Sequence, residues 1–215
     1  MTTSPAPRLY LATPEIGEPA AIGGQLLALI GVADIAAVLL RLAAADERTQ
    51  INRIKTLAPE IQAQGVAVLI EGHVGLVARA GADGAHVSGL DTLEGALRAL
   101  KPQRMVGIGG LQSRHDSMIA GETGADYLLF GEPDARGQRP ALAAIVERLQ
   151  WWAEVFEPPC VGYAAALSEV GALAATGADF IMLGDAVWTD ARGPAEALKE
   201  AAAIVAGTLA KDSET

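Results

Sequence analysis

The sequence predicts a single-domain α/β protein, a (β/α)₈ barrel of the TIM type, from two features that run along the chain. Short segments rich in Val, Ile and Leu alternate eight times with Ala- and Leu-rich segments of helical spacing. Gly-Ala-Asp occurs at 81–83, 124–126 and 177–179, each time between a helical segment and an apolar one. A length of 215 residues suits a small barrel. The alternative is a doubly wound open sheet, but no Gly-x-Gly-x-x-Gly follows the first apolar segment, where a dinucleotide fold has it.

Eight strands are expected, each short and rich in branched aliphatic residues, as strands covered on both faces are. They are Leu9–Ala12, Ile35–Leu40, Val66–Ile70, Ala85–Val87, Met105–Ile108, Tyr127–Phe130, Cys160–Gly162 and Phe180–Leu183. If the barrel is closed, the last of these strands lies beside the first.

Helical spacing is clearest in four of the intervening segments. They are Glu47–Gln64, Leu93–Leu100, Leu142–Phe156 and Ala195–Leu209. Thr92 is expected to cap the second of these helices, and Pro194 stands in the first turn of the last, where proline is tolerated. In each Gly-Ala-Asp, glycine is expected to end a helix in a left-handed turn. One domain then spans residues 1–215, with 1–8 and 210–215 as flexible tails.

Composition excludes several classes of protein. Hydrophobic residues make up 51% of the chain, which excludes a disordered protein, and the single cysteine, Cys160, excludes a disulfide-stabilised module. The net charge of −10 is unfavourable for binding nucleic acid or an anionic membrane. Met1–Arg8 lacks the apolar core of a signal peptide, and no apolar run approaches the roughly 20 residues of a membrane span. We therefore expect a cytoplasmic protein with no nucleic-acid or membrane partner; a homodimer stays open.

In a barrel of this type, reacting groups lie after the strands, at the carboxyl ends. Gly109 and Gly110 follow the fifth strand, where their N–H groups and a helix start favour an anion. Arg114 and His115 come next and could add charge-assisted hydrogen bonds, and Arg136 with its neighbour Arg139 forms a second basic spot. Tyr163 follows the seventh strand. We expect an anionic ligand at the loops after the fifth and sixth strands.

Metal binding has two competing interpretations. Glu71 and Asp91 follow adjacent strands and could share Mg²⁺, although Asp91 could instead cap a helix. The three histidines, His73, His86 and His115, lie in or after consecutive predicted strands and could hold a catalytic zinc, but no tightly spaced pair fixes their geometry.

Three segments resemble thiamine phosphate synthase and its TenI-type relatives. They are Leu9–Thr13 (LYLAT), Gly81–Val87 (GADGAHV) and Gly124–Tyr127 (GADY), and the resemblance extends from about Leu9 to Gly207. It implies a (β/α)₈ barrel and a transferase of thiamine biosynthesis. Such an enzyme joins an aminopyrimidine pyrophosphate to a thiazole phosphate and releases pyrophosphate with Mg²⁺. The implied substrate is a small phosphorylated heterocycle.

The resemblance assigns roles to some residues. Arg41 matches an arginine that meets the pyrophosphate, and Asp91 matches a metal-binding aspartate. Glu71 and Gly72 stand where the family has Asn-Asp, so one carboxylate of the metal site is missing or displaced by one residue. Arg136 is a substitute cation in a segment that has lost its Thr-x-Thr-Lys.

Other positions depart from the family pattern. Leu39 and Ala43 replace a glutamine and a lysine, and Ala164-Ala165 replaces the glycine pair of the thiazole phosphate site. Asp185 replaces a serine of that site, and its charge opposes a phosphate.

These departures leave three functions to weigh. The first is a divergent synthase with slow or undetectable activity. The second is a non-catalytic or regulatory protein that binds a thiamine-related ligand. The third is a TenI-type thiazole isomerase that uses His86 or His115 as its general base.

Overall fold

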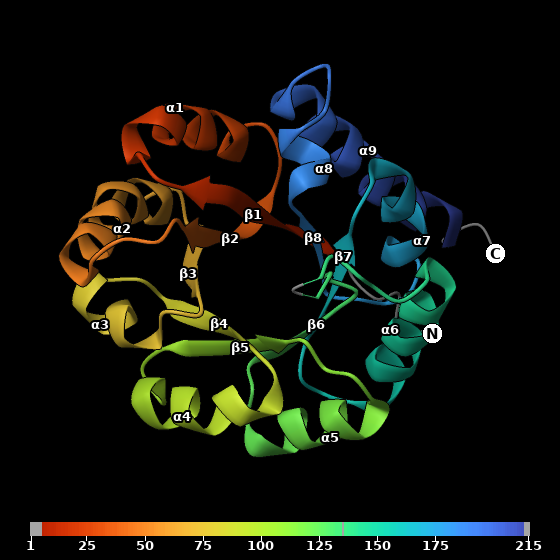
Figure 1. Cartoon of the computed structure of the whole chain (residues 1–215). Coiled ribbons are helices and arrows are strands. Elements are labelled where there is room, and N and C mark those ends of the chain that lie inside the picture. Colours follow the sequence, from red (N-terminus) through yellow and green to blue (C-terminus); the bar gives the residue numbers. More distant parts are fainter. Residues whose placement is uncertain (1–5, 135, 213–215) are drawn as a thin grey trace.

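The computed structural model describes residues 6–134 and 136–212 and shows a closed barrel of eight parallel strands in chain order (Figure 1). The strands are β1 (Arg8–Ile16), β2 (Ile35–Leu42), β3 (Ala67–Glu71), β4 (Gly84–Ser88), β5 (Met105–Gly109), β6 (Tyr127–Phe130), β7 (Cys160–Ala164) and β8 (Phe180–Leu183). Leu9 of β1 lies opposite Ile181 of β8, so the last strand closes onto the first. The predicted fold class and closure are confirmed.

The helices surround the barrel (Figure 1). They are α1 (Pro19–Ile30), α2 (Glu47–Gln62), α3 (Val77–Ala80), α4 (Leu90–Leu100), α5 (Arg114–Thr123), α6 (Leu142–Val155), α7 (Val170–Ala174), α8 (Asp185–Trp188) and α9 (Pro194–Asp212), with short 3₁₀ turns η1 (Val74–Leu76) and η2 (Leu167–Glu169). Pro194 is the first residue of α9, as predicted. Among the described residues, no helix is long and apolar enough to cross a membrane.

Several predicted boundaries were wrong by one to four residues, and two of them concern polar residues near the strand ends. β1 continues to Ile16 because Thr13 stays in the barrel wall, where it is buried and its Oγ1 accepts the N–H of Arg41 at 3.1 Å. The helix after β4 begins at Leu90, so Thr92 does not cap it. The Thr92 hydroxyl instead donates to the carbonyls of Ser88 and Gly89, at 3.0 and 2.8 Å.

Parts of the expected flexible tails belong to regular elements. Arg8 begins β1 and forms an ion pair with Asp34, with Nη2 and Oδ1 2.7 Å apart. Residues 210–212 belong to α9. The remaining tail residues 1–5 and 213–215 lie outside the described residues.

The Gly-Ala-Asp turns connect adjacent strands through their aspartates. Gly81, Gly124 and Gly177 have φ of +81°, +106° and +84°, the left-handed conformation that was predicted. The carboxylates of Asp83, Asp126 and Asp179 accept the N–H of Val68, Val106 and Cys160, at 2.8, 2.6 and 2.8 Å. Each aspartate also donates its own N–H to the carbonyl of the same partner. Each turn therefore holds the start of the preceding strand in one register.

The barrel lumen contains a small polar network among apolar side chains. The hydroxyls of Tyr10 and Tyr127 share a hydrogen bond of 3.0 Å, and the Tyr127 hydroxyl lies 3.0 Å from His86 Nδ1. The rings of His86 and Tyr127 are stacked, with centroids 5.6 Å apart. Gly107 makes room for this arrangement, because a Cβ there would collide with the Tyr127 ring. Burial lowers the pKa of His86 to about 4, so this histidine is neutral at physiological pH.

The register role of the turns predicts a stability loss for Asp83→Ala. That variant leaves the buried N–H of Val68 without its partner, and we expect the free energy of unfolding to fall by about 1–3 kcal/mol. Asp83→Asn keeps an acceptor oxygen and should recover most of the loss. Urea denaturation measures both variants, and equal stability of Asp83→Ala and the parent would contradict the assigned role.

Buried, neutral His86 predicts a loss of stability in acid. Its folded-state pKa of about 4 lies below the ordinary value near 6.5, so the unfolded chain takes up this proton first as pH falls. The stability that comes from neutral His86 is fully present above pH 6.5 and is lost as the pH falls from 6.5 to 4. At pH 5, the free energy of unfolding should already have fallen by about 2 kcal/mol. Urea denaturation at pH 7 and pH 5 should show this drop in the parent and not in His86→Asn. Equal drops in the two proteins would disprove it.

Candidate active site

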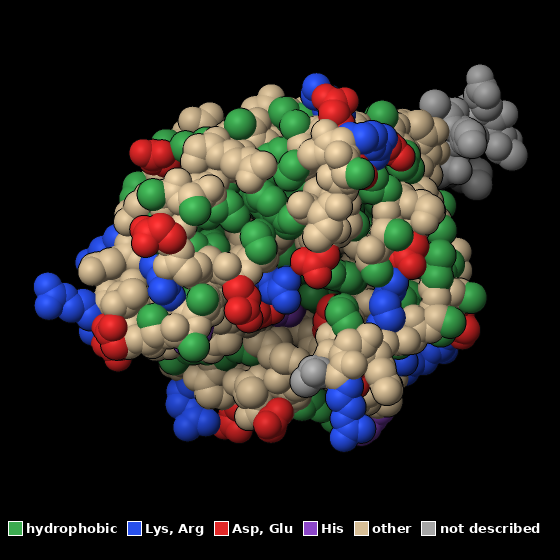
Figure 2. All heavy atoms as spheres, turned by 45° about the horizontal axis from the view of Figure 1, so that its top comes forward, with side chains coloured by type: hydrophobic (Ala, Val, Ile, Leu, Met, Phe, Trp, Pro, Cys, Tyr) green, Lys and Arg blue, Asp and Glu red, His purple; other side chains and the backbone are tan. Residues whose placement is uncertain are grey.

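Two adjoining cavities open at the carboxyl ends of the strands, with volumes of about 420 and 260 Å³. Figure 2 shows the hollow on this face, with acidic and basic side chains around it. Ser88, Leu129, Glu132 and Pro133 border both cavities. The polar residues of the smaller cavity include five that the sequence singled out: Arg41, Glu71, His86, Tyr163 and Asp185. The structure thus brings these five predicted residues together.

Charges of both signs meet in the smaller cavity. Arg41 Nε lies 3.5 Å from Glu71 Oε2, and this buried nitrogen makes no hydrogen bond to any described residue. Burial raises the pKa of Tyr163, and the negative charge of Asp185 raises it further, whereas Arg41 opposes the shift. The cavity can therefore offer a guanidinium to an anion, although the carboxylates of Glu71 and Asp185 belong to the same lining.

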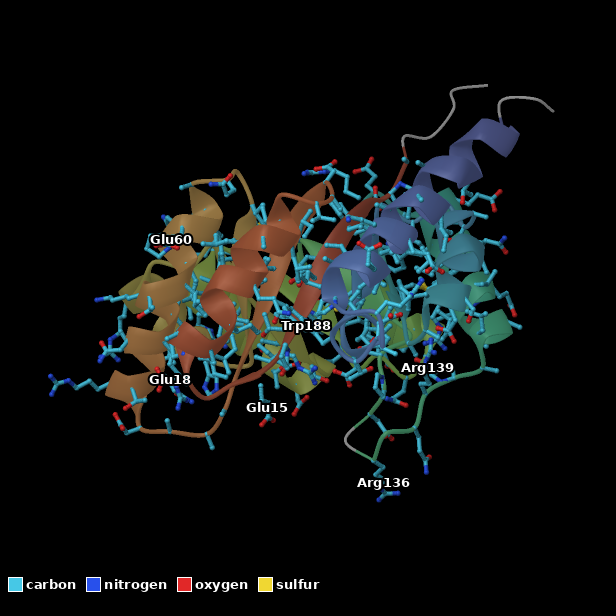
Figure 3. All side chains as sticks on the ribbon, turned by 90° about the horizontal axis from the view of Figure 1, so that it is seen from above. Glu15, Glu18, Glu60, Arg136, Arg139 and Trp188 are labelled. Carbon is cyan, nitrogen blue, oxygen red and sulfur yellow. The ribbon has the colours of Figure 1, made fainter. Side chains whose placement is uncertain are left out.

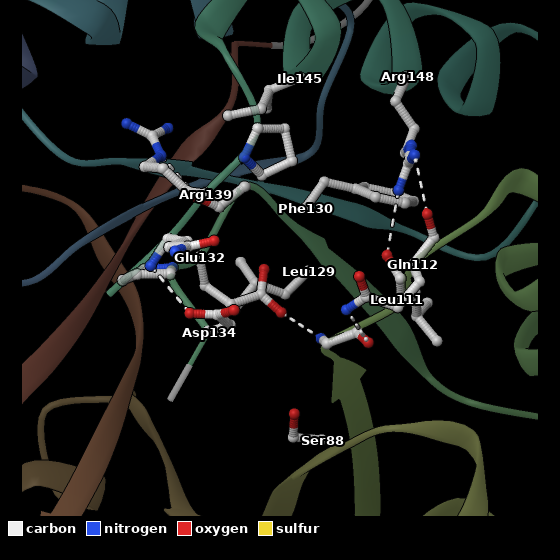
Figure 4. Close-up of a pocket in the computed structure, with 15 residues that line it drawn as sticks. Ser88, Leu111, Gln112, Leu129, Phe130, Glu132, Asp134, Arg139, Ile145 and Arg148 are labelled. Carbon is white, nitrogen blue, oxygen red and sulfur yellow. Dashed lines mark hydrogen bonds between the residues drawn. The ribbon is translucent and has the colours of Figure 1, made fainter. Parts of the chain in front are cut away.

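The sequence analysis did not assign Glu132 to the site. Its carboxylate accepts the backbone N–H of Gly110 (Figure 4). This N–H group was expected to bind an anionic ligand. Burial raises the pKa of Glu132, and the hydrogen bond from Gly110 acts against that shift. A Cβ on Gly109 would collide with Glu132 Oε1 and would lie 3.0 Å from His86 Nε2. The glycine pair therefore accommodates a carboxylate of this chain, which corrects the predicted anion cradle.

Arg139 fixes the loop between β6 and α6. It donates to the carbonyls of Gly131 and Tyr163, at 2.9 and 3.2 Å, and to both carboxylate oxygens of Glu169 at 2.9 Å. Glu169 also accepts the N–H of Ala165, at 2.9 Å. The N–H of Ala165, which follows β7 and could otherwise bind a phosphate, is thus already bound to the carboxylate of Glu169.

Arg136 is not brought to either cavity. Figure 3 shows it at the far tip of the same loop, pointing away from the barrel, with Arg139 closer to the strand ends. Its side chain is exposed, and its backbone N–H donates to Asp134 Oδ1 at 2.8 Å.

Arg114 and His115 also lie outside both cavities, which corrects the expectation that they face the same ligand as Gly110. Both are exposed in the first turn of α5. The Arg114 guanidinium pairs with Glu147 at 2.7 Å and lies 4.8 Å from the ring centroid of Trp151, so it binds α5 to α6. Of the histidines proposed as catalytic, only His86 lines a cavity.

The alternative of a zinc site at the three histidines finds no support in the part of the chain that is described. No group of three His, Cys, Asp or Glu side chains there could hold a metal ion. His73 lies against Gln50, with their Nε2 atoms 3.3 Å apart. Asp91 is the second residue of α4, and its Oδ1 lies 2.8 Å from the position of a Cβ on Gly89, beside Ser88 at the cavity edge. Asp91 therefore stays near the cavities without lining them.

Sequence comparison identifies the relatives of this chain. A family model described as thiamine monophosphate synthase matches residues 9–192. A thiamine-phosphate synthase of Rhodospirillum centenum is 37% identical over 203 residues, covering 93% of this chain and 98% of that protein. A second, from Hyphomonas neptunium, is 33% identical and covers 92% of this chain and 94% of its own.

Solved structures agree on the fold. A thiamine phosphate pyrophosphorylase from Pyrococcus furiosus superposes with a TM-score of 0.77 at 24% identity, covering 94% of this chain and 96% of that one. A 3-hexulose-6-phosphate synthase from Salmonella typhimurium reaches 0.70 at 19% identity, covering 93% and 99%. The structures establish the barrel, and the matches in sequence show that this chain belongs to the thiamine monophosphate synthase family.

Proposed function

We propose that the cavities carry out thiamine phosphate synthesis, which makes the chain a transferase. An aminopyrimidine diphosphate and a thiazole phosphate are joined, and pyrophosphate is released. The observation that carries this proposal is the convergence of Arg41, His86 and Tyr163 in one cavity at the carboxyl ends of the strands. Relatives named thiamine-phosphate synthase match over nearly the whole chain, which favours the synthase over a non-catalytic binder. The exposed position of His115 is unfavourable for its use as an isomerase base.

The reaction needs a cation beside the leaving group. The C–O bond between the pyrimidine methylene and the diphosphate breaks, its electron pair leaves with pyrophosphate, and the thiazole nitrogen forms the new C–N bond. Arg41 is the cation that lines the smaller cavity, and its Nε is buried with no hydrogen bond to the described residues. We assign Arg41 to the diphosphate, because a guanidinium stabilises the negative charge that grows on the leaving group.

The second anion is placed by the remaining charges. Asp185 makes the loop after β8 acidic, and after β7 the N–H of Ala165 is already bound to Glu169, so both loops disfavour a phosphate. The larger cavity lies at the loops after β5 and β6 and includes Arg148, which donates to the carbonyl of Leu111 at 3.1 Å (Figure 4). We place the thiazole phosphate beside Arg148, and Arg114, His115 and Arg136 are not part of this proposal.

Mg²⁺ is proposed as the accompanying ion. The described residues contain no preformed cluster of three ligands, but Mg²⁺ needs only one or two carboxylates when substrate phosphates supply the other oxygens. Glu71 lines the smaller cavity, and Asp91 lies against Gly89, the residue after the cavity-lining Ser88, so these two carboxylates fit a metal that binds with the diphosphate. When bound, the ion neutralises charge on the leaving pyrophosphate.

Partners and compartment complete the proposal. The substrates are small phosphorylated heterocycles, bound without nucleic acid by a cytoplasmic protein. We also propose a homodimer, which light scattering of the purified protein would test by measuring its molar mass in solution.

Arg41→Ala tests the proposed function. In an assay with both substrates and Mg²⁺, we expect the parent to form thiamine phosphate and Arg41→Ala to lose about 10- to 100-fold in kcat/KM, the value of one charge-assisted interaction. Arg98→Ala is the matched control, because Arg98 lies exposed on α4 and, among the described residues, pairs with Glu94 alone. No product from the folded parent would refute the synthase, and unchanged activity of Arg41→Ala would refute the role of Arg41.

Metal binding should depend on the diphosphate. Titration calorimetry should show weak binding of Mg²⁺ to the free protein and tighter binding once pyrophosphate is present, because the described residues offer no complete site of their own. Asp91→Asn should weaken the binding seen with pyrophosphate by about tenfold or more. Tight binding of Mg²⁺ without pyrophosphate, or an unaffected Asp91→Asn, would contradict the assignment.

A further inference from the structure

We propose that Glu132 binds the aminopyrimidine: its carboxylate accepts an N–H of the exocyclic amino group and stabilises the positive charge that develops on that ring. This inference rests on the proposed function and goes further, because it names the residue that distinguishes the aminopyrimidine from the thiazole.

Glu132 occupies the place where the two cavities meet. It follows Gly131 at the carboxyl end of β6 and borders both spaces. Gly110 holds one of its oxygens, Oε1, by a backbone hydrogen bond, and Oε2 makes no hydrogen bond to another residue in the described part of the chain. One oxygen is thus fixed, and the other is free to accept from a ligand.

The space for this carboxylate is provided by the backbone. Gly109 must lack a Cβ, because that atom would collide with Oε1. Gly131 has φ of +95°, and a Cβ there would lie 2.8 Å from the side chain of Ile145. Gly109 thus leaves room for Oε1, and the hydrogen bond from Gly110 holds that oxygen, so the carboxylate is positioned to meet a ligand.

The charges around Glu132 leave it without a matching cation. No ion pair joins it to any residue that the structure describes. On β4, His86 is neutral; on β6 and β7, Tyr127 and Tyr163 are neutral phenols whose pKa is raised further by the negative charge of Glu132. On α6, Arg148 exerts a favourable charge, but it donates to the carbonyls of Leu111 and Gln112.

This environment selects between the two substrates. A buried carboxylate with a free oxygen needs a hydrogen-bond donor, and it gains most from a donor that carries positive charge. Both substrates carry phosphate groups that a carboxylate repels, so the ring decides, and the ring of the thiazole phosphate has no N–H group. The aminopyrimidine has an exocyclic amino group, and its ring becomes cationic when the C–O bond to the diphosphate breaks. The geometry therefore assigns Glu132 to the pyrimidine.

The test compares the aminopyrimidine diphosphate with an analogue in which hydrogen replaces the amino group. Titration calorimetry without the thiazole should show that the parent binds the amino compound about 10- to 100-fold more tightly than the analogue. Glu132→Gln keeps an oxygen for Gly110 and removes the charge, and this preference should shrink to a few-fold or less. With both substrates present, the fold-loss of kcat in Glu132→Gln relative to the parent should exceed its fold-loss of affinity for inorganic pyrophosphate.

Controls separate this inference from the proposed function. Glu154→Gln changes an exposed carboxylate of α6 and should behave as the parent does. If Glu132→Gln does not fold, Glu132→Asp is the second variant, because its shorter side chain keeps the charge but holds it further from the ligand. It should lose part of the preference for the amino compound over the analogue. A parent that makes no thiamine phosphate would refute the synthase itself. A productive parent whose preference is unchanged in Glu132→Gln would overturn the role of Glu132 alone and leave it as a residue that holds Gly110.

Discussion

The hydrogen bonds from aspartate carboxylates to strand amides are the constraint on which the site depends. In each of three turns, one aspartate binds both the N–H and the carbonyl of a residue at the start of the neighbouring strand. A slip of one residue would turn every side chain of that strand to the other face of the sheet. Because the register is fixed at the starts of these strands, His86 and Tyr163 emerge at the other end in the cavity that Arg41 also lines.

Carboxylates shape the functional face more than cations do. Glu132 takes the backbone donor of Gly110, and Glu169 takes that of Ala165. Glu71 lies against Arg41, and Asp185 lines the smaller cavity. A ligand anion must therefore compete with side chains of the protein for several of its contacts. Such competition favours a ligand that brings its own counter-ion and disfavours free phosphate.

The sequence predicted the barrel well because its signals are local. Runs such as Tyr127–Phe130 and Phe180–Leu183 are strands with the expected bounds, and the glycines of the repeated turns have the expected left-handed conformation. The site was predicted only in part, because the reach of a side chain depends on the exact start of its helix. Arg114 begins α5 and points to Glu147 of α6, a contact that links distant parts of the sequence. Glu132 was missed since nothing local shows that Gly110 would face it.

The contacts of Arg139 have a mechanical consequence. One guanidinium holds the carbonyl of Gly131, the carbonyl of Tyr163 and the carboxylate of Glu169. The loop after β6 and the segment after β7 are thereby linked through a single side chain, and neither can open without breaking contacts made by the other. A ligand that drew Arg139 away from Glu169 would loosen both at once, so the two segments beside the cavities are mechanically coupled through one residue.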